Sequence, residues 1–333
     1  MRKMSRLASA VAVLCLTCFL AAHNPAVAQQ QYEIQVFKLN DHLIVFYTGR
    51  LAPPSVPADQ RTWAESGALD LGIATFAIHS GREALVYDTF TSTDLAKWVR
   101  SYLERMGIAR FTVVNSHWHL DHVGGNAVYE DSTIIGNRRT YDSLTEKKEP
   151  IEAGKLWGPP AVKPLVLPNL MFDKRLDVQV GPIRVELHNI NIHTADSVVA
   201  YLPSDKILLA GDTLEDSVTF VSEPDTVVEQ LPNFKLLKQW DFTRILPNHG
   251  NPKVIAAGGY DKTLIDATSS YVRLLLAKAH DKGFVESAFE DYIADSVAKG
   301  WVSAWKPYQH VHEVNVKRIH KVYQDKPLPR LED

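Results

Sequence analysis

The segment His-Trp-His-Leu-Asp-His at residues 117–122 constrains this chain more than any other stretch of its sequence. It follows directly on the run Phe111–Val114, which is rich in β-branched and aromatic side chains and is typical of a short strand. Side chains two residues apart in an extended chain fall on the same side, so His117 and His119 can bind one metal ion. The segment therefore predicts a metal site at the end of a strand.

The rest of the segment indicates a second metal position beside the first. Gly124 and Gly125 permit the chain to turn, so that Asp121 and His122 point towards a neighbouring site. Imidazole and carboxylate ligands together suit Zn²⁺ or a similar ion. The alternative is a polar loop that happens to be rich in histidine, and the spacing directly after a strand argues against it.

Further candidate ligands follow three other predicted strands. His193 lies in NINIHTADS, Asp212 in ILLAGDTL and His249 in RILPNHG. A single His or Asp in such a place is more often a cap or a surface residue. Because open α/β sheets form their sites at strand ends, the three together predict that these side chains join the metal site.

The chain alternates predicted strands and helices, which is typical of an α/β layered fold with helices covering the sheets. Proline-rich loops at 49–72 and 149–168 interrupt the pattern and are long enough to border a site. The periodicity predicts strands at 32–37, 43–47, 73–79, 83–89, 111–114, 176–180, 183–188, 198–202, 207–210 and 244–246, and helices at 93–106, 233–240 and from 260 to about 324.

The first 28 residues have the order of a secretory signal peptide. Arg2, Lys3 and Arg6 precede an apolar run that ends near Ala22, and Ala26-Val27-Ala28 forms a small-residue cleavage site. A membrane anchor is the alternative, but the apolar run is short for a spanning helix. We therefore expect a periplasmic or secreted protein with no membrane contact after cleavage.

Cleavage before Gln29 would change the chemistry open to the chain. The segment removed contains both cysteines, Cys15 and Cys18, so the mature protein has no disulfide and must bind metal through His and carboxylates. It also contains three of the 36 Lys and Arg residues and none of the 39 Asp and Glu residues, which leaves a net charge of −6. This acidic balance disfavours nucleic acid, and we expect a small-molecule substrate.

The motifs HWHLDH, HTADS, GDT and NHG, in this order, resemble those of the metallo-β-lactamase superfamily. The resemblance covers roughly residues 32–259 and implies an α/β protein, an αββα sandwich with two zinc ions per chain at one edge. Together with the signal sequence, this extent divides the chain into a signal peptide at 1–28, a metallo-β-lactamase-fold domain at 29–259 and a C-terminal helical segment at 260–333. The resemblance implies a first metal bound by His117, His119 and His193, a second bound by Asp121, His122 and His249, and Asp212 as a bridge.

The resemblance also implies a zinc-dependent hydrolase. A hydroxide held between two zinc ions is available near neutral pH and attacks an acyl carbon, as in an ester, lactone, thioester or amide. Asp121 would be the catalytic residue that orients this nucleophile and carries its proton. Asp88 in VYDT matches a family aspartate that supports ligand orientation, and a strand-end turn residue is the alternative.

Two positions depart from the superfamily's β-lactamases that use a cysteine in the second site. Asp212 stands where these enzymes have the cysteine, and Glu215 stands where they commonly carry a lysine that grips the carboxylate of the drug. A carboxylate there would repel an anionic β-lactam, so we expect neutral lactones or esters to be better substrates. A β-lactamase is the first alternative, and a phosphodiesterase or a non-catalytic metal-binding protein comes next.

The loops around the motifs supply candidates for a substrate pocket. They are Trp63, Trp157, Glu215 and Phe220, with Leu156 and Leu165 nearby, and simple packing of the loops is the alternative.

The C-terminal segment, rich in aromatic residues, is expected to form helical cladding. His310 and His312 are two apart in a predicted helix and share no face, so we interpret them as surface or packing residues. A homodimer contact, or a wall of the pocket, is the alternative for this segment.

Overall fold

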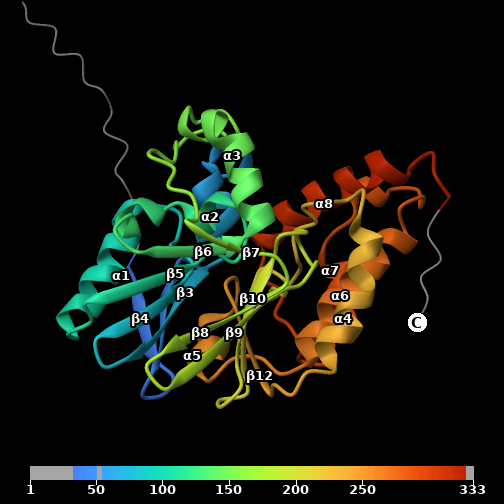
Figure 1. Ribbon diagram of the computed structural model, residues 1–333. Coiled ribbons are helices and arrows are strands. Elements are labelled where there is room, and N and C mark those ends of the chain that lie inside the picture. Colours follow the sequence, from blue (N-terminus) through green and yellow to red (C-terminus); the bar gives the residue numbers. More distant parts are fainter. Residues whose placement is uncertain (1–32, 51–54, 328–333) are drawn as a thin grey trace, which may run out of the picture. The chain divides into compact units, whose positions relative to one another are not determined.

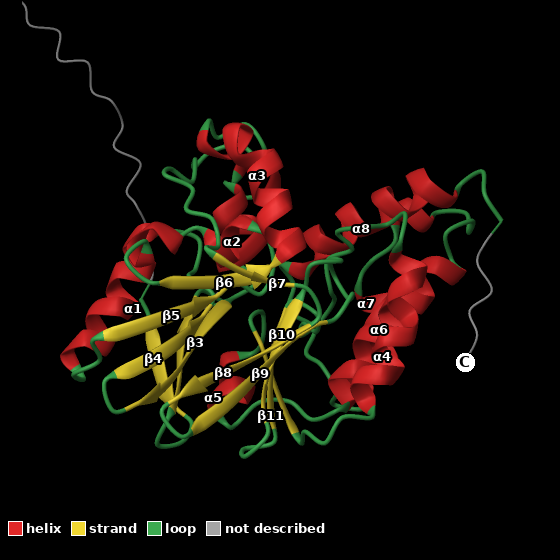
Figure 2. Cartoon of the chain, in the orientation of Figure 1, coloured by secondary structure: helices red, strands yellow, loops and turns green. Residues whose placement is uncertain are grey.

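The computed structural model describes residues 33–50 and 55–327 and places them in layers of helix, sheet, sheet and helix. Figure 2 shows the strands at the centre, with α1, α2 and α3 on one side and α4, α6, α7 and α8 on the other. This arrangement confirms the predicted αββα sandwich. The predicted signal peptide at 1–28 lies outside the described residues. Among those residues, no helix has both the length and the apolar character needed to cross a membrane.

The first sheet has seven strands in sequence order, β1 to β7 (Figure 1). Strands β1 to β4 are antiparallel, and β4, β5, β6 and β7 are parallel to one another. The bounds are β1 Gln35–Lys38, β2 Leu43–Thr48, β3 Ile73–Ser80, β4 Glu83–Tyr87, β5 Arg110–Val114, β6 Thr133–Asn137 and β7 Leu170–Phe172.

The second sheet has the order β12-β11-β10-β9-β8, in which only β11 and β12 are parallel. Its β8 contacts β3 and β4, so the inner faces of the two sheets share one apolar core. The bounds are β8 Arg175–Val180, β9 Ile183–Asn189, β10 Val198–Leu202, β11 Ile207–Gly211 and β12 Arg244–Pro247.

Helix α1 covers the outer face of the first sheet through its apolar side. In α1, Trp98 and Tyr102 pack their rings against Phe46 of β2, and Ser92 caps the helix by accepting from the backbone N–H of Leu95. The bounds are α1 Thr93–Arg105, α2 Leu120–Val123, α3 Arg138–Glu152, α4 Val227–Lys238, α5 Pro252–Ala256, α6 Thr263–Ala277, α7 Glu290–Ala298 and α8 Tyr308–Tyr323.

Two predicted boundaries were wrong at prolines. Helix α3 continues through Pro150 to Glu152, which shortens the predicted loop 149–168, and α4 begins at Val227 rather than after Pro232. Proline removes one helical hydrogen bond. In α4 the apolar residues on both sides of Pro232, among them Leu231 and Phe234, are buried in the core, and this burial outweighs the missing bond.

Candidate metal centre

The first candidate ligands lie where the central strand β5 ends. Strand β5 is paired on both sides with parallel strands, so the position of its last residue is fixed by the sheet. Two residues intervene before His117, and its imidazole lies 4.4 Å from that of His119 between ring centroids. Asp121 and His122 belong to the short helix α2 that follows.

Helix α2 makes the turn after the histidines, which corrects the role predicted for the glycine pair. Gly124 and Gly125 have ordinary negative φ angles of −59° and −95°. A Cβ at Gly124 would lie 2.4 Å from the carbonyl oxygen of Thr91, and one at Gly125 would lie 2.2 Å from that of Thr89. The glycines are therefore needed because the end of α2 lies against the segment that follows β4.

The other candidate ligands also lie at strand ends, as predicted. Asp212 directly follows β11, and His249 lies two residues after β12. His193 lies in the connection between β9 and β10, where it has a φ of 70°, and its backbone N–H donates to the side chain of Gln230.

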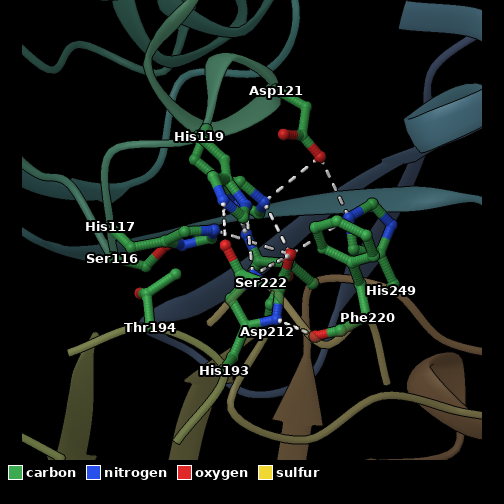
Figure 3. A network of polar contacts seen from close by, with 12 residues as sticks. Ser116, His117, His119, Asp121, His193, Thr194, Asp212, Phe220, Ser222 and His249 are labelled. Atoms are coloured by element: carbon green, nitrogen blue, oxygen red, sulfur yellow. Dashed lines mark hydrogen bonds and ion pairs between the residues drawn. The ribbon is translucent and has the colours of Figure 1, made fainter. Parts of the chain in front are cut away.

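All seven predicted ligands are brought together in two groups that share Asp212, and all are buried. Figure 3 labels these side chains except His122. Within each group the candidate ligand atoms all lie within 4.8 Å of one another. The first group is His117, His119, His193 and Asp212, and the second is Asp121, His122, Asp212 and His249.

In several of the candidate histidines, a hydrogen bond to one ring nitrogen fixes the ring so that its other nitrogen faces the centre of the group. The Nδ1 atoms of His193 and His249 donate to the carbonyl oxygens of Phe220 and Gly72, at 3.0 and 2.8 Å. In His122, Nδ1 donates to Asp88 at 2.9 Å. Contacts of this kind fix the ring orientation of metal-binding histidines.

The chemistry of these groups fits divalent metal ions. His117 Nε2 and Asp212 Oδ1 are buried and have no hydrogen-bond partner among the described residues. Burial and the neighbouring imidazoles hold the pKa of His117 well below its usual range, so this ring is neutral, as a metal ligand must be. Burial lowers the pKa of His249 too, but Asp212 and Asp121 outweigh it and raise that pKa to about 9. The two carboxylates therefore favour a positive charge at this position, and a metal ion can supply that charge in place of the proton.

Asp88 lies behind the second group, where the sequence predicted a supporting residue. Its carboxylate accepts from the backbone N–H of Ser116 at 2.7 Å, from Asn248 Nδ2 at 2.7 Å and from His122 Nδ1 at 2.9 Å. The side chain is buried, and the backbone at this residue has a φ of 67°. Asp88 thus ties together the segments that carry three of the candidate ligands, His117, His122 and His249.

Asp196 is a supporting residue that the sequence analysis did not single out. Its carboxylate accepts from the backbone N–H of Trp118 at 2.9 Å and from Thr140 Oγ1 at 2.8 Å. Burial raises its pKa to about 6. The contact fixes the backbone between His117 and His119. The signal was present in the motif HTADS, three residues after His193.

A cavity of about 330 Å³ opens over both groups, a size suited to a small molecule. The four predicted pocket residues Trp63, Trp157, Glu215 and Phe220 all line it. The ring of Trp157 lies 5.2 Å from that of His119 and 5.9 Å from that of Trp63. Trp63 and Trp157 come from the two proline-rich loops, so these loops meet at the cavity.

Two apolar residues predicted near the pocket lie elsewhere. Leu165 is buried in a small cluster with Leu120 and Val123, and Leu156 packs against the same cluster. These side chains hold the second loop down on α2, and neither lines the cavity.

The C-terminal helix α8 forms one wall of the cavity. His310, Val311, Val314 and Arg318 line it, which agrees with the alternative that this segment borders the pocket. His312 faces away and is buried between Tyr271 and Ser287, as expected of a packing residue.

Glu215 lines the cavity, but the chain's own donors occupy its carboxylate. Oε1 accepts from the backbone N–H of Phe220 at 3.0 Å and from Thr219 at 3.1 Å, and Oε2 accepts from Tyr308 of α8 at 3.3 Å. Burial and Asp212 raise the pKa of Glu215 to about 8. The carboxylate is therefore held in the wall by the chain's own donors, and its repulsion of anionic substrates stays a prediction.

Comparisons with known proteins agree with this fold and site. A family model described as the metallo-beta-lactamase superfamily matches residues 69–266. The "Beta-lactamase-like protein 2 homolog" of Caenorhabditis elegans is 28% identical over 185 residues, which are 54% of this chain. The match covers 56% of that relative, so the chain spans about half of its length.

Solved structures share the fold at lower identity. A metallo-beta-lactamase from Pontibacter korlensis is 17% identical with a TM-score of 0.55, over 72% of this chain and 99% of that one. The DIM-1 metallo-beta-lactamase exposed to ceftazidime is 19% identical with a TM-score of 0.53, over 73% and 97%. At such identities the likeness shows the fold alone.

Proposed function

The chain belongs to the metallo-β-lactamase superfamily, and we propose that it is an exported dinuclear zinc hydrolase that cleaves an ester, a lactone or a related acyl bond of a small molecule. The observation that carries this proposal is the pair of ligand groups that share Asp212 at the base of a cavity. Each group offers four His or Asp ligand atoms, the kind and number that zinc takes.

The two groups would hold one metal ion each. When bound, a pair of zinc ions supplies a water molecule that is deprotonated near neutral pH and a Lewis acid for the carbonyl oxygen. The protein contributes a fixed set of imidazoles, since Phe220, Gly72 and Asp88 hold the outer nitrogens of His193, His249 and His122. This preorganisation lowers the cost of assembling the site.

Asp121 is the side chain we assign to proton handling. It lines the cavity, and its Oδ2 lies 3.1 Å from His249 Nε2 and 3.2 Å from His122 Nε2. A carboxylate in this place can orient the attacking water and accept its proton. Trp63 and Trp157, which line the cavity, exclude bulk water and bind the apolar part of the substrate.

A kinetic panel tests the proposal. We expect the purified, zinc-loaded protein to hydrolyse lactones and aryl esters with a higher kcat/KM than penicillins, cephalosporins, carbapenems or an aryl phosphodiester. His249→Ala, which removes a ligand of one group only, should abolish most of this activity. A higher kcat/KM on any β-lactam than on every ester and lactone would establish the β-lactamase alternative. Bound metal without hydrolysis of any of these substrates would establish the non-catalytic one.

Export is the part of the proposal that rests on the first 28 residues. We expect the mature protein in the periplasm or the medium, with its N-terminus at or within a residue or two of Gln29, because charged, apolar and small residues follow in the order of a signal peptide. Intact-mass spectrometry of the fractionated protein checks this. A membrane-bound form that keeps Arg2 would contradict it.

A further inference from the structure

The cavity over the candidate ligands has one strongly basic side chain in its wall. Among the described residues that line it, Arg318 of α8 is the only Lys or Arg. Arg318 also borders a second, outer cavity of about 950 Å³, lined in part by Lys321 and Lys326. It therefore lies between the outer surface and the space above the ligand groups.

The guanidinium of Arg318 is held in place but is not neutralised. Its Nη2 donates to the carbonyl oxygen of Ser222, and its Cζ lies 5.3 Å from the centre of the Phe220 ring. Its Nε is buried and has no hydrogen-bond partner among the described residues. Asp225 attracts it electrostatically, with no ion pair between the two side chains in the described part of the chain. A fixed guanidinium with an unpartnered donor is suited to a planar anion.

The segment that holds Arg318 also contacts the first ligand group. The carbonyl oxygen of Phe220 accepts from His193 Nδ1, and Ser222 Oγ lies 3.1 Å from His119 Nε2. Arg318 thus contacts Phe220 and Ser222, and each of these residues contacts one candidate metal ligand. Val311 and Val314, on the preceding turns of α8, line the same wall and leave this part of the cavity mainly apolar.

From this geometry we propose that Arg318 binds a carboxylate carried by the substrate, at the end remote from the acyl bond that is cleaved. The substrate class is an ester or lactone with an apolar body and a terminal carboxylate. The inference rests on the proposed function, and it revises the expectation of neutral substrates that was drawn from Glu215. A half-buried guanidinium without a counter-charge loses part of its hydration, and a carboxylate that accepts from two of its nitrogens offsets that cost.

Matched esters test this assignment. The substrates are nitrophenyl hemiesters of linear dicarboxylic acids of increasing length, each compared with the nitrophenyl ester of the monocarboxylic acid of equal length. In the wild type we expect a higher kcat/KM for the hemiester at one or more lengths. Arg318→Gln should lower this preference by about 10- to 100-fold, as expected for hydrogen bonds between charged groups, mainly through KM. Arg318→Lys should retain part of it.

Lys321→Gln is the control, because it removes the same charge from the same helix at a residue that lines only the outer cavity. It should leave the preference unchanged. A preference that is absent from the wild type, or equal in the wild type and Arg318→Gln, overturns the assignment while the esterase activity stands. An equal loss on both ester series with a lower thermal stability means that Arg318 is structural, which also overturns it.

Binding measurements separate this inference from the proposed function. Calorimetry with dicarboxylates and monocarboxylates of equal length reports affinity without hydrolysis, and both series offer one carboxylate to the metal site. The dicarboxylate should bind more tightly to the wild type and lose that advantage in Arg318→Gln. If no ester or lactone is cleaved, the proposed function fails and this comparison alone decides the role of Arg318. Equal affinities in the wild type would refute it.

Discussion

Replacing Asp212 with alanine is expected to remove most metal from both positions and to lower kcat/KM by about 1000-fold or more. The reason is that Asp212 belongs to both ligand groups. Its Oδ2 lies 3.0 Å from His122 Nε2, 3.5 Å from His249 Nε2 and 3.8 Å from the Nε2 atoms of His117 and His193, and its Oδ1 is free of any partner among the described residues. Without this carboxylate, buried imidazoles remain and the charge that would attract two cations is greatly reduced.

Elemental analysis of dialysed protein measures this effect, with two single-group variants for comparison. His193→Ala should weaken the first metal more than the second, and His249→Ala should do the reverse. The wild type should hold two ions per chain. A fully loaded wild type with one ion, or an Asp212→Ala protein with two, would refute a shared carboxylate.

Replacing Asp88 with alanine is expected to lower the free energy of unfolding strongly, although Asp88 is not a predicted ligand. The change leaves three buried donors without their acceptor: the backbone N–H of Ser116, Nδ2 of Asn248 and Nδ1 of His122. At about 1 kcal/mol or more for each, the free energy of unfolding should fall by at least about 3 kcal/mol. Because His122 loses the group that orients its ring, affinity for the second metal should fall by about 10- to 100-fold.

Denaturant unfolding of the metal-free protein and zinc titration of the folded protein measure the two effects separately. Asp173→Ala is a control at an exposed aspartate and should change the unfolding free energy by less than about 0.5 kcal/mol. Asp88→Asn should be intermediate, because an amide oxygen keeps one acceptor and loses the charge. Wild-type stability and zinc affinity in Asp88→Ala would show that the contacts of Asp88 do not determine ligand orientation.

A layered α/β fold and the proximity of the seven candidate ligands could be predicted from local patterns in the sequence, whereas the αββα sandwich was implied by the resemblance to the superfamily. The ligands come directly after apolar strands, and the ends of neighbouring strands meet at one edge of a sheet. His117, Asp212 and His249 illustrate this, since each lies within three residues of the end of its strand. The order of the motifs supplied the rest.

A wall of the pocket was only one of the alternatives for the C-terminal helix, and which of its residues would form that wall could not be predicted, because this depends on contacts between distant parts of the chain. Asn315 of α8 donates to the carbonyl oxygen of Thr219 and accepts from the backbone N–H of Val221, 94 residues away in the sequence. Nothing in the periodicity of α8 shows which of its residues would face the segment that supports His193. The contacts that hold Glu215 in the cavity wall could not be predicted for the same reason, since its partner Tyr308 also lies in α8.

The origin of the cavity wall has a consequence for how such an enzyme could diverge. Every candidate ligand lies between residues 117 and 249, inside the segment that the family model matches. The wall residues of α8, which are His310, Val311, Val314 and Arg318, lie beyond its end at 266. Substitutions at Val311 and Val314 can therefore alter which molecules enter without removing a group that would hold a metal. If the reaction is kept while the available substrates change, we expect substitutions that alter substrate preference to arise first in this helix. The same helix is the segment to randomise in directed evolution.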